Sequence, residues 1–293
     1  MNKVRGHIAM IGAEMLWGAG APVGKVILLG GITPMLFVNL RFVGATVLFW
    51  LISFVFPKEH VEPRDYIKIF GASLLAIVLN LVSYLIGLNK TSPVDAAIIP
   101  TVLPVITMVM AWAVLREPIT GLKAAGVFVG AAGAVTLIVT GSHDNNNSAS
   151  VLGDCLVLLS QISFCCYLVF FKGLISKYSP VTLMKWMFTF ATICVLPFTA
   201  QEFWLQDWSS LSTVVILGCI FYIVGPTFLS FVLLPIGQRS LRPTVTAMYN
   251  YVQPIVALII AVIAGLGRIN VWNGTAMIMV FTGVYMVTRS RAR

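Results

Sequence analysis

Long apolar stretches of this 293-residue chain contain several ionisable side chains, among them Glu14, Lys25 and Arg41. A charged group is costly in such surroundings, so each of the three is a candidate for a function. An apolar environment favours the neutral form of a carboxylate, which suits Glu14 to take up and release a proton. A carboxylic acid that only joins helices through hydrogen bonds is the alternative interpretation of Glu14.

The two cations also have two interpretations. Lys25 and Arg41 lie in the outer thirds of their apolar stretches, and their long side chains can reach the membrane surface from there. Alternatively, they face an outward vestibule, where they attract carboxylates or take part in gating. We therefore keep both residues as candidates for coupling or gating.

Two prolines are further candidates for gating. Pro104 and Pro254 occupy matching positions 150 residues apart, and each lies inside an apolar stretch. A proline frees a backbone carbonyl and bends its helix, so the pair could act as hinges. Simple bends that only improve packing are the alternative.

Trp17 and a later polar cluster are candidates for a binding site. Trp17 lies three residues after Glu14 on the same helix face, and its indole N–H needs a partner away from water. The cluster contains Tyr249, Asn250 and Gln253, and their spacing places parts of it on one helix face. The segment 150 residues earlier is nearly apolar, so a substrate without symmetry would find this cluster in one half only.

Three more polar residues complete the predicted substrate-binding set. Asn80 and Tyr84 are four residues apart in one apolar stretch, and Gln161 lies near the middle of another. Hydrogen bonding between helices is the alternative role of these side chains, and such a bond stabilises a membrane protein by about 1 kcal/mol.

Composition identifies the elements that must position these residues. Hydrophobic residues make up 59% of the chain and charged residues 10%, and the mean hydropathy is +0.95. Soluble domains contain about 25% charged residues, so an ordinary soluble enzyme, a disordered chain and a disulfide scaffold are excluded. Ten stretches are long enough to cross about 30 Å of hydrocarbon as helices, which predicts an all-α integral membrane protein with ten transmembrane helices. They run at about 7–29, 34–56, 66–88, 94–115, 121–140, 151–172, 180–200, 211–234, 244–264 and 271–288.

The net charge of +9 is distributed unevenly between the two sides of these stretches. With the termini inside, only Lys90 and Arg268 fall on the outer face, while Lys25, Arg41 and Lys185 lie within stretches; every other lysine and arginine is on the inner face. Basic residues collect in cytoplasmic loops of membrane proteins. We therefore expect both termini to be cytoplasmic, and we expect the basic residues to orient the chain in a lipid bilayer rather than bind nucleic acid.

The two halves of the chain resemble each other at an offset of about 150 residues, as Pro104 and Pro254 illustrate. Each half contains five of the predicted helices, an odd number, so the second copy must be inverted relative to the first. We predict two inverted five-helix repeats, at residues 1–140 and 151–288. Repeats of this kind are typical of secondary transporters, which bind substrate near the midplane where the repeats meet.

The chain resembles the drug/metabolite transporter superfamily, specifically its ten-helix proteins with two EamA domains. The resemblance covers nearly the whole chain through the order and spacing of short motifs. These are LWGAGAPVGK (16–25) with Arg41, TSPVDAAIIPTVLPVITMVMAWAVLREPIT (91–120), GVFVGAAGAV (126–135), LRPTVTAMYNYVQPIVALIIAVIAGL (241–266) and TGVYMV (282–287). One departure is GRIN at 267–270, where the first half has EPIT at 117–120 and the family usually has a Glu-Pro-like turn. The resemblance implies export or exchange of small metabolites, often amino acids, across a bacterial inner membrane.

Two other functions are weighed against this expectation. A carrier of nucleotide-sugars or nucleobases is the first alternative, but a phosphate substrate calls for paired basic residues near the midplane, and the sequence places none there. A membrane-embedded lipid-modifying enzyme is the second, and it requires a cluster of His, Asp and Glu that is not visible. Because nucleotide, metal and catalytic-serine motifs are missing, we expect no enzyme activity, no cofactor and no metal site. Glu14 makes a proton the candidate coupling ion. The coupling ion, the oligomeric state, the substrate and the direction of transport are left open.

Overall fold

The computed structural model describes residues 3–90, 99–141, 151–263 and 271–290, and every element within these ranges is a helix. The first half contains α1 (Lys3–Leu29), α2 (Pro34–Ser53), α3 (Pro63–Ser73), η1 (Leu74–Leu79), α4 (Asn80–Lys90), η2 (Ile99–Val102), α6 (Leu103–Leu115) and α7 (Gly121–Gly141). The second half contains α8 (Val151–Phe170), α9 (Lys172–Lys177), α10 (Pro180–Leu205), η3 (Trp208–Ser210), α11 (Thr213–Tyr222), η4 (Ile223–Leu229), α12 (Ser230–Ser240), α13 (Pro243–Met248), η5 (Tyr249–Tyr251), α14 (Val252–Ile263) and α15 (Val271–Arg289).

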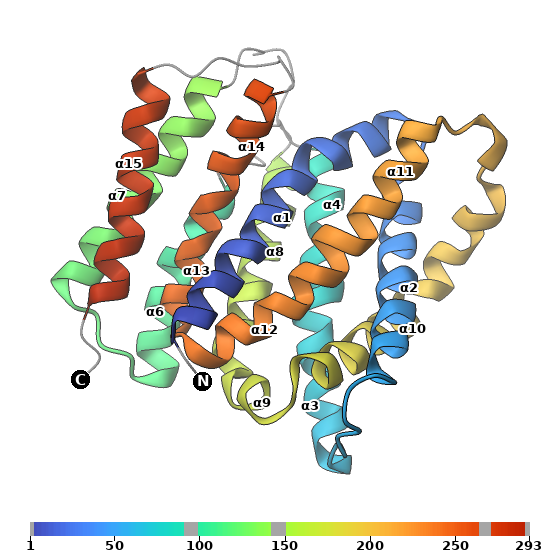
Figure 1. The fold of residues 1–293 in the computed structure, drawn as a ribbon, viewed down its shortest axis with the longest axis horizontal. Helices are drawn as coiled ribbons and strands as arrows, with labels where there is room; N and C mark the ends of the chain where they lie inside the picture. The colour runs from blue at the N-terminus through green and yellow to red at the C-terminus, as the bar shows by residue number, and fades with distance from the viewer. Residues whose placement is uncertain (1–2, 91–98, 142–150, 264–270, 291–293) are drawn as a thin grey trace.

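Length and apolar composition identify the membrane-spanning elements. Five continuous helical segments of the described chain can cross a bilayer: α2, α3 through α4, α8, α10 and α11 through α12. Shorter apolar helices cover Ile99–Leu115 and Gly121–Thr136. The helices α1, α13 through α14, and α15 complete the bundle. α1 begins and α15 ends at the same end of the molecule, as an even number of crossings requires (Figure 1). The predicted all-α membrane protein is confirmed, and the helices of the described chain are consistent with ten crossings.

The second helix of each repeat begins at the same kind of capping sequence. The side chains of Thr33 and Ser179 accept hydrogen bonds from the backbone N–H groups of Leu36 and Thr182, each at 3.2 Å. A proline follows each capping residue, where its missing N–H costs nothing and its fixed φ suits the first turn. The repeat is therefore encoded locally as well as in the hydropathy pattern.

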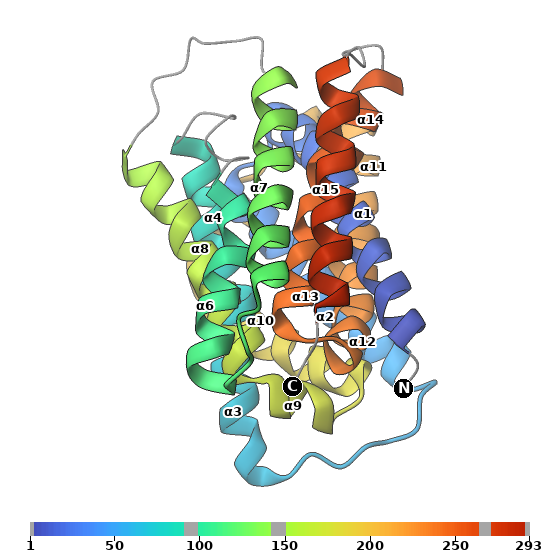
Figure 2. The same ribbon diagram turned by 90° about the vertical axis from the view of Figure 1, so that its left-hand side faces the viewer.

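Equivalent helices of the two repeats pack against each other. α7 and α15 lie side by side at one edge of the molecule, as Figures 1 and 2 both show, and α2 packs along α10. Glycines permit the close approach of the first pair, because a Cβ added to Gly126 would lie 2.8 Å from the carbonyl oxygen of Gly283. These contacts join equivalent helices of the two repeats at two places in the bundle.

A π-helical segment interrupts the third helix of each repeat. η1 joins α3 to α4 and η4 joins α11 to α12, at positions about 150 residues apart. A π-helical turn replaces i→i−4 hydrogen bonds with i→i−5 bonds, and it leaves backbone carbonyls available to other partners. The two segments therefore place backbone acceptors at equivalent points in the membrane interior.

Candidate functional site

Glu14 forms one end of a hydrogen-bond network that crosses from the first repeat to the second. The Glu14 side chain is only 3% exposed, and its Oε2 accepts a hydrogen bond of 2.7 Å from Nε2 of Gln253. The same Gln253 amide donates to Oδ1 of Asn250 at 2.8 Å, and Nδ2 of Asn250 donates to the Pro100 carbonyl at 3.0 Å. This midplane network, Glu14–Gln253–Asn250–Pro100, joins α1, α14, η5 and η2.

The network ends where equivalent positions of the repeats touch. Asn250 and Pro100 are 150 residues apart, and so are Tyr251 and Thr101, whose side-chain hydroxyl and backbone carbonyl form a hydrogen bond of 3.1 Å. η2 and η5 are both 3₁₀ segments, and an apolar helix follows each of them. Their contact joins equivalent segments of the two repeats, and transporters built from inverted repeats bind substrate where the repeats meet.

Pro104 and Pro254 lie just after these two 3₁₀ segments. Pro104 is in the first turn of α6, and Pro254 follows the start of α14 by two residues. A change from 3₁₀ to α-helical backbone beside a proline is a local weak point of a helix. Their role as hinges stays a prediction that this geometry makes physically reasonable.

Trp17 donates its indole N–H to a carbonyl of the π-helical segment η4. The distance from Nε1 to the Pro226 oxygen is 2.8 Å. On α8 of the second repeat, the hydroxyl of Ser163 donates to the Leu75 oxygen of η1 at 2.7 Å. Because α1 and α8 are equivalent helices, the first helix of each repeat donates a hydrogen bond to a carbonyl of the π-helical segment in the other repeat. Trp17 therefore stabilises the irregular backbone, and its ring also packs edge-on against Phe231 at 5.7 Å.

Asn80 and Gln161 form a second polar group, between α4 and α8. Nδ2 of Asn80 donates to the Ser160 carbonyl at 2.9 Å, and Nε2 of Gln161 donates to the Ser160 hydroxyl at 2.9 Å. Gln161 stands 147 residues after Glu14, the same offset that separates Lys25 from Lys172. The structure thus places an amide in the second repeat where the first repeat has a carboxylate.

Arg41 and Tyr84 belong to a third group, near η4. The Arg41 side chain is 4% exposed, its Nε donates to the Thr227 hydroxyl at 3.0 Å, and its guanidinium lies 4.8 Å from the centre of the Tyr222 ring. The Tyr84 hydroxyl is within electrostatic range of Arg41 and Tyr222. No carboxylate pairs with Arg41 within the described ranges. A buried guanidinium stabilised by aromatic faces and a hydroxyl retains its capacity to bind an anion.

The remaining sequence candidates lie apart from these groups. The Tyr249 hydroxyl forms a 2.6 Å hydrogen bond with Nδ1 of His7, two turns of α1 before Glu14. The backbone of Lys25 is part of α1, but its side chain lies outside the described part of the structure. The predicted binding set is therefore distributed over several helix contacts, of which the midplane network joins Glu14, Asn250 and Gln253 directly.

The sequence-based candidates do not include a buried ion cluster at the end of the molecule where α1 begins. Lys123 is fully buried, and its Nζ lies 2.9 Å from Oε1 of Glu117. Arg242 approaches the same oxygen at 3.6 Å, and the Thr244 hydroxyl donates to Oε2 at 3.2 Å. Among the described residues, Oε1 of Glu117 and Nη1 of Arg242 have no well-aligned hydrogen-bond partner. Electrostatic attraction rather than hydrogen bonding therefore stabilises the contact between these two atoms.

Arg242 and one further cation, Lys172, extend these contacts across the bundle. Nη2 of Arg242 donates to the Ser290 carbonyl at the end of α15, at 2.8 Å. Nζ of Lys172 donates to the Leu241 carbonyl between α12 and α13, at 2.6 Å. The turn between α6 and α7 is thereby joined to α13 and α15 of the other repeat. The Arg-Glu-Pro sequence at 116–118 was the only sequence signal that could have pointed to this cluster. In the structure Arg116 adopts a left-handed φ of 55° at this turn.

Two cavities lie in the bundle away from the midplane network. One cavity of about 470 Å³ is lined by Leu40, Phe203, Trp204 and Trp208, and a second of about 340 Å³ lies where α2 ends and α10 begins. Neither touches the midplane network. In the part of the chain that the structure describes, no three His, Cys, Asp or Glu side chains gather as a metal site.

Several relatives match this chain in sequence over most of their length. An uncharacterized transporter from Archaeoglobus fulgidus is 23% identical over 262 residues, which is 89% of this chain and 90% of that protein. The WAT1-related protein At4g30420 from Arabidopsis thaliana is 25% identical, with 98% of this chain and 85% of that protein covered. A solved crystal structure superposes with a TM-score of 0.79 at 15% identity, covering 98% of both chains, and supports the fold.

The family match accounts for both repeats. The EamA-like transporter family matches residues 4–139 and again residues 151–289. Together the two segments include every transmembrane helix that the structure describes. The two copies also explain why capping sequences, π-helical segments and glycine contacts recur at an offset near 150 residues. The chain therefore belongs to the EamA-like transporter family.

Proposed function

We propose that this transporter exports or exchanges small metabolites, in particular amino acids or related amphipathic solutes, by alternating access about the midplane. The observation that carries the proposal is the midplane network, because it places a buried carboxylate at the contact between the repeats. No lysine or arginine among the described residues pairs with Glu14. The substrate-binding set is Trp17, Asn80, Tyr84, Gln161, Tyr249, Asn250 and Gln253.

The chemistry of this set favours a zwitterionic solute with an apolar part. Gln253 and Asn250 provide both amide donors and carbonyl acceptors, and Trp17 provides an apolar face. An ammonium group can replace the Gln253 amide as the partner of Glu14, while a carboxylate can accept from the amide N–H groups. The buried Arg41 offers a second anion-binding group toward the outer half of the bundle.

Glu14 couples transport to protons in this proposal. A carboxylate in the membrane interior is stable when it is neutral or when it faces a cation, and unstable when it is left alone. Substrate and proton therefore compete for Glu14, which is what exchange of one for the other requires. Release of the Gln253 hydrogen bond is the local event that accompanies either binding step.

Alternating access requires the inner end to open. The ion cluster of Glu117, Lys123 and Arg242 closes that end by joining the two repeats. Opening must separate these groups, and Pro104 and Pro254 are placed to absorb the bend in the helices that carry the network. Lys25 and Arg41, in the outer halves of α1 and α2, are assigned to gating on the opposite side.

The proposed location is a bacterial inner membrane, with both ends of the described chain on the cytoplasmic side. The excess of basic residues at the end where α1 begins supports this orientation. Single cysteines placed in the loop at 57–62 and in the segment at 206–212 would test it. A membrane-impermeant thiol reagent applied to intact cells is expected to label only the second position.

Counterflow in proteoliposomes tests the transport proposal. Liposomes loaded with an unlabelled amino acid are expected to accumulate the same labelled amino acid, and a pH gradient is expected to drive accumulation without preloading. A panel of amino acids, nucleobases and nucleotide-sugars identifies the substrate class. Exchange of nucleotide-sugars or nucleobases alone would replace the amino-acid assignment, and failure of every solute to exchange would overturn the proposed function.

The lipid-modifying enzyme is distinguished by the same preparation. Mass spectrometry of the liposome lipids after incubation is expected to show unchanged masses. A new lipid species that depends on the protein would favour the enzyme. The Glu14→Gln variant serves as the control, because only the transport proposal requires it to lose the response to the pH gradient.

A further inference from the structure

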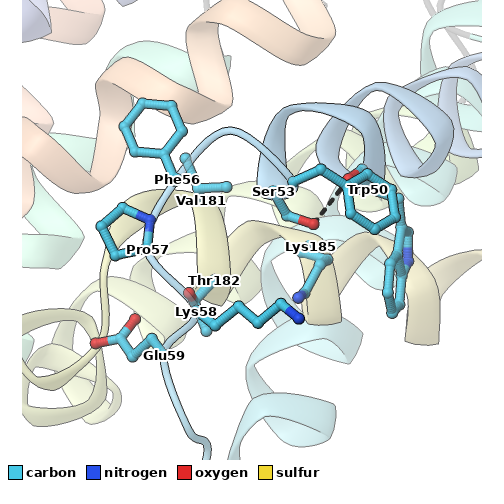
Figure 3. A pocket seen from close by; sticks show the side chains of 10 residues that line it. Trp50, Ser53, Phe56, Pro57, Lys58, Glu59, Val181, Thr182 and Lys185 are labelled. Atoms are coloured by element: carbon cyan, nitrogen blue, oxygen red, sulfur yellow. Dashed lines mark hydrogen bonds between the residues drawn. The ribbon is translucent and has the colours of Figure 1, made fainter.

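A cavity of about 340 Å³ lies at the inner end, between the end of α2, the loop that follows it and the start of α10 (Figure 3). Phe54, Phe56 and Val181 form an apolar part of its wall. Lys58 and Lys185 form a basic part, and Figure 3 shows both ammonium groups directed into the cavity. A wall with one apolar and one cationic part is the surface that an amphipathic anion requires.

Neither lysine is neutralised by a carboxylate of the described chain. The nearby carboxylate of Glu59 points away from both ammonium groups in Figure 3. It instead accepts a hydrogen bond of 2.9 Å from the backbone N–H of Ser179. Two like charges that face one cavity repel each other, so an anion between them lowers the free energy of the arrangement.

The depth of Lys185 matches the level of lipid headgroups. It lies five residues after the start of α10, which is about 8 Å along the helix axis. Each headgroup layer is roughly 5–8 Å thick, so this height is close to the lipid phosphates. Its Nζ lies 4.6 Å from the ring centre of Trp50 and 5.6 Å from that of Trp186, two aromatic residues of the kind that collect at this boundary.

We propose that this cavity binds the headgroup of an anionic phospholipid, with the phosphate between Lys58 and Lys185. The acyl chains lie along Phe54 and Phe56, whose side chains are 75% and 50% exposed and border the hydrocarbon. Free phosphate carries a similar charge but has no acyl chains to contact the apolar part of the wall. The lipid links α2 to α10, which are equivalent helices of the two repeats.

Lipid titration of the full chain in neutral detergent tests the proposal. Phosphatidylglycerol is expected to raise the unfolding temperature saturably, and phosphatidylcholine and inorganic phosphate are not. The apparent affinity for phosphatidylglycerol is expected to exceed that for phosphatidylcholine by about 30-fold, because each lysine near an anionic lipid contributes roughly a factor of five. An equal response to inorganic phosphate would identify a free-anion site and overturn the lipid assignment.

Matched variants locate the site. Lys58→Gln combined with Lys185→Gln is expected to lose the preference for phosphatidylglycerol, whereas Lys3→Gln, a basic residue on the same face outside the cavity, is expected to retain it. If the double variant does not fold, Lys58→Gln alone, in an exposed loop, is expected to lose about fivefold. Native mass spectrometry of the wild type is expected to retain phosphatidylglycerol in preference to phosphatidylcholine. Unchanged binding by the variants, or no lipid preference in the wild type, would overturn the proposal.

Discussion

The two repeats use the same position in different ways. Glu14 on α1 and Gln161 on α8 are equivalent residues, but Glu14 is bound by Gln253 of the other repeat, whereas Gln161 donates to Ser160 of its own helix. One position is therefore ionisable and joined across the repeats, and the other is neutral and satisfied locally. If Glu14 couples transport to protons as proposed, the symmetric scaffold assigns this role to one half only.

Removal of the ionisable member is expected to have the largest effect on transport. Glu14→Gln preserves size and hydrogen bonding but cannot exchange a proton, so accumulation driven by a pH gradient is expected to be abolished. Downhill counterflow is expected to persist at a raised half-saturating substrate concentration, because the variant lacks the carboxylate that pairs with the substrate ammonium group. Proteoliposome uptake at matched protein levels measures both, and full gradient-driven uptake by the variant would remove Glu14 from the coupling step.

The reciprocal change sharpens the comparison. Gln161→Glu in the Glu14→Gln background restores a midplane carboxylate. Position 161 contacts Ser160 of its own helix, however, and Gln253 is hydrogen-bonded to position 14 instead. Proton coupling is expected to stay lost because the new carboxylate does not lie across the contact between repeats. Recovery of gradient-driven uptake would show that the number of carboxylates matters rather than their position.

The inner ion cluster is expected to dominate stability. Lys123→Met leaves Glu117 buried without its nearest cation, which costs about 3–5 kcal/mol when one member of a buried pair is removed. Thermal unfolding in detergent measures the loss. The double variant Lys123→Met with Glu117→Gln is expected to recover part of it, because no uncompensated charge then remains, and a single variant as stable as the wild type would contradict the structural role.

The hydrogen bonds to the π-helical segments are expected to have smaller and equal effects. Trp17→Phe and Ser163→Ala each remove the donor to a freed carbonyl, at Pro226 and Leu75 respectively. Each is expected to cost about 1 kcal/mol, the usual contribution of such a bond in a membrane protein. If Trp17→Phe also raises the half-saturating substrate concentration while Ser163→Ala does not, Trp17 contacts the substrate as well.

An exposed ion network provides the smallest expected effect. Lys177 bridges Glu62 and Asp65 at 2.7 Å each, but its side chain is 43% exposed. The hydrogen bonds that Lys177 donates to Asp65 and Glu62 raise its pKa, so their stabilisation is present at neutral pH and is lost only in strongly alkaline solution. Lys177→Gln is expected to unfold at nearly the wild-type temperature at neutral pH, because water screens this network.

Much of the fold could be predicted because membrane helices are encoded in single stretches of sequence. Ten apolar stretches, capping residues such as Ser179, and glycines such as Gly283 are visible without any contact information. The inner cluster was not predicted, since Lys123 and Glu117 have the composition of ordinary loop charges. The order of apolar stretches predicts at which side of the membrane a charged side chain lies. It does not predict whether the loop that carries the side chain folds inward and buries it.

The candidate site was predicted in part for the same reason. Polarity inside apolar stretches selected both Glu14 and Gln253 as candidates, and the structure shows that they are hydrogen-bonded to each other. Their roles in transport stay predictions. Polarity could not reveal that the Trp17 indole would donate to a backbone carbonyl, because the π-helical segment that frees the carbonyl has an ordinary apolar sequence.

The sequence by itself determined the number of helices, the inverted repeat and the set of polar residues in the membrane, because burial in lipid imposes length, composition and charge asymmetry on each segment separately. Only the tertiary structure decided which of those polar residues meet. Gln253 reaches Glu14, and Lys123 reaches Glu117, because helices distant in sequence pack at fixed angles and heights. Pairing across repeats depends on that packing, which no local pattern records.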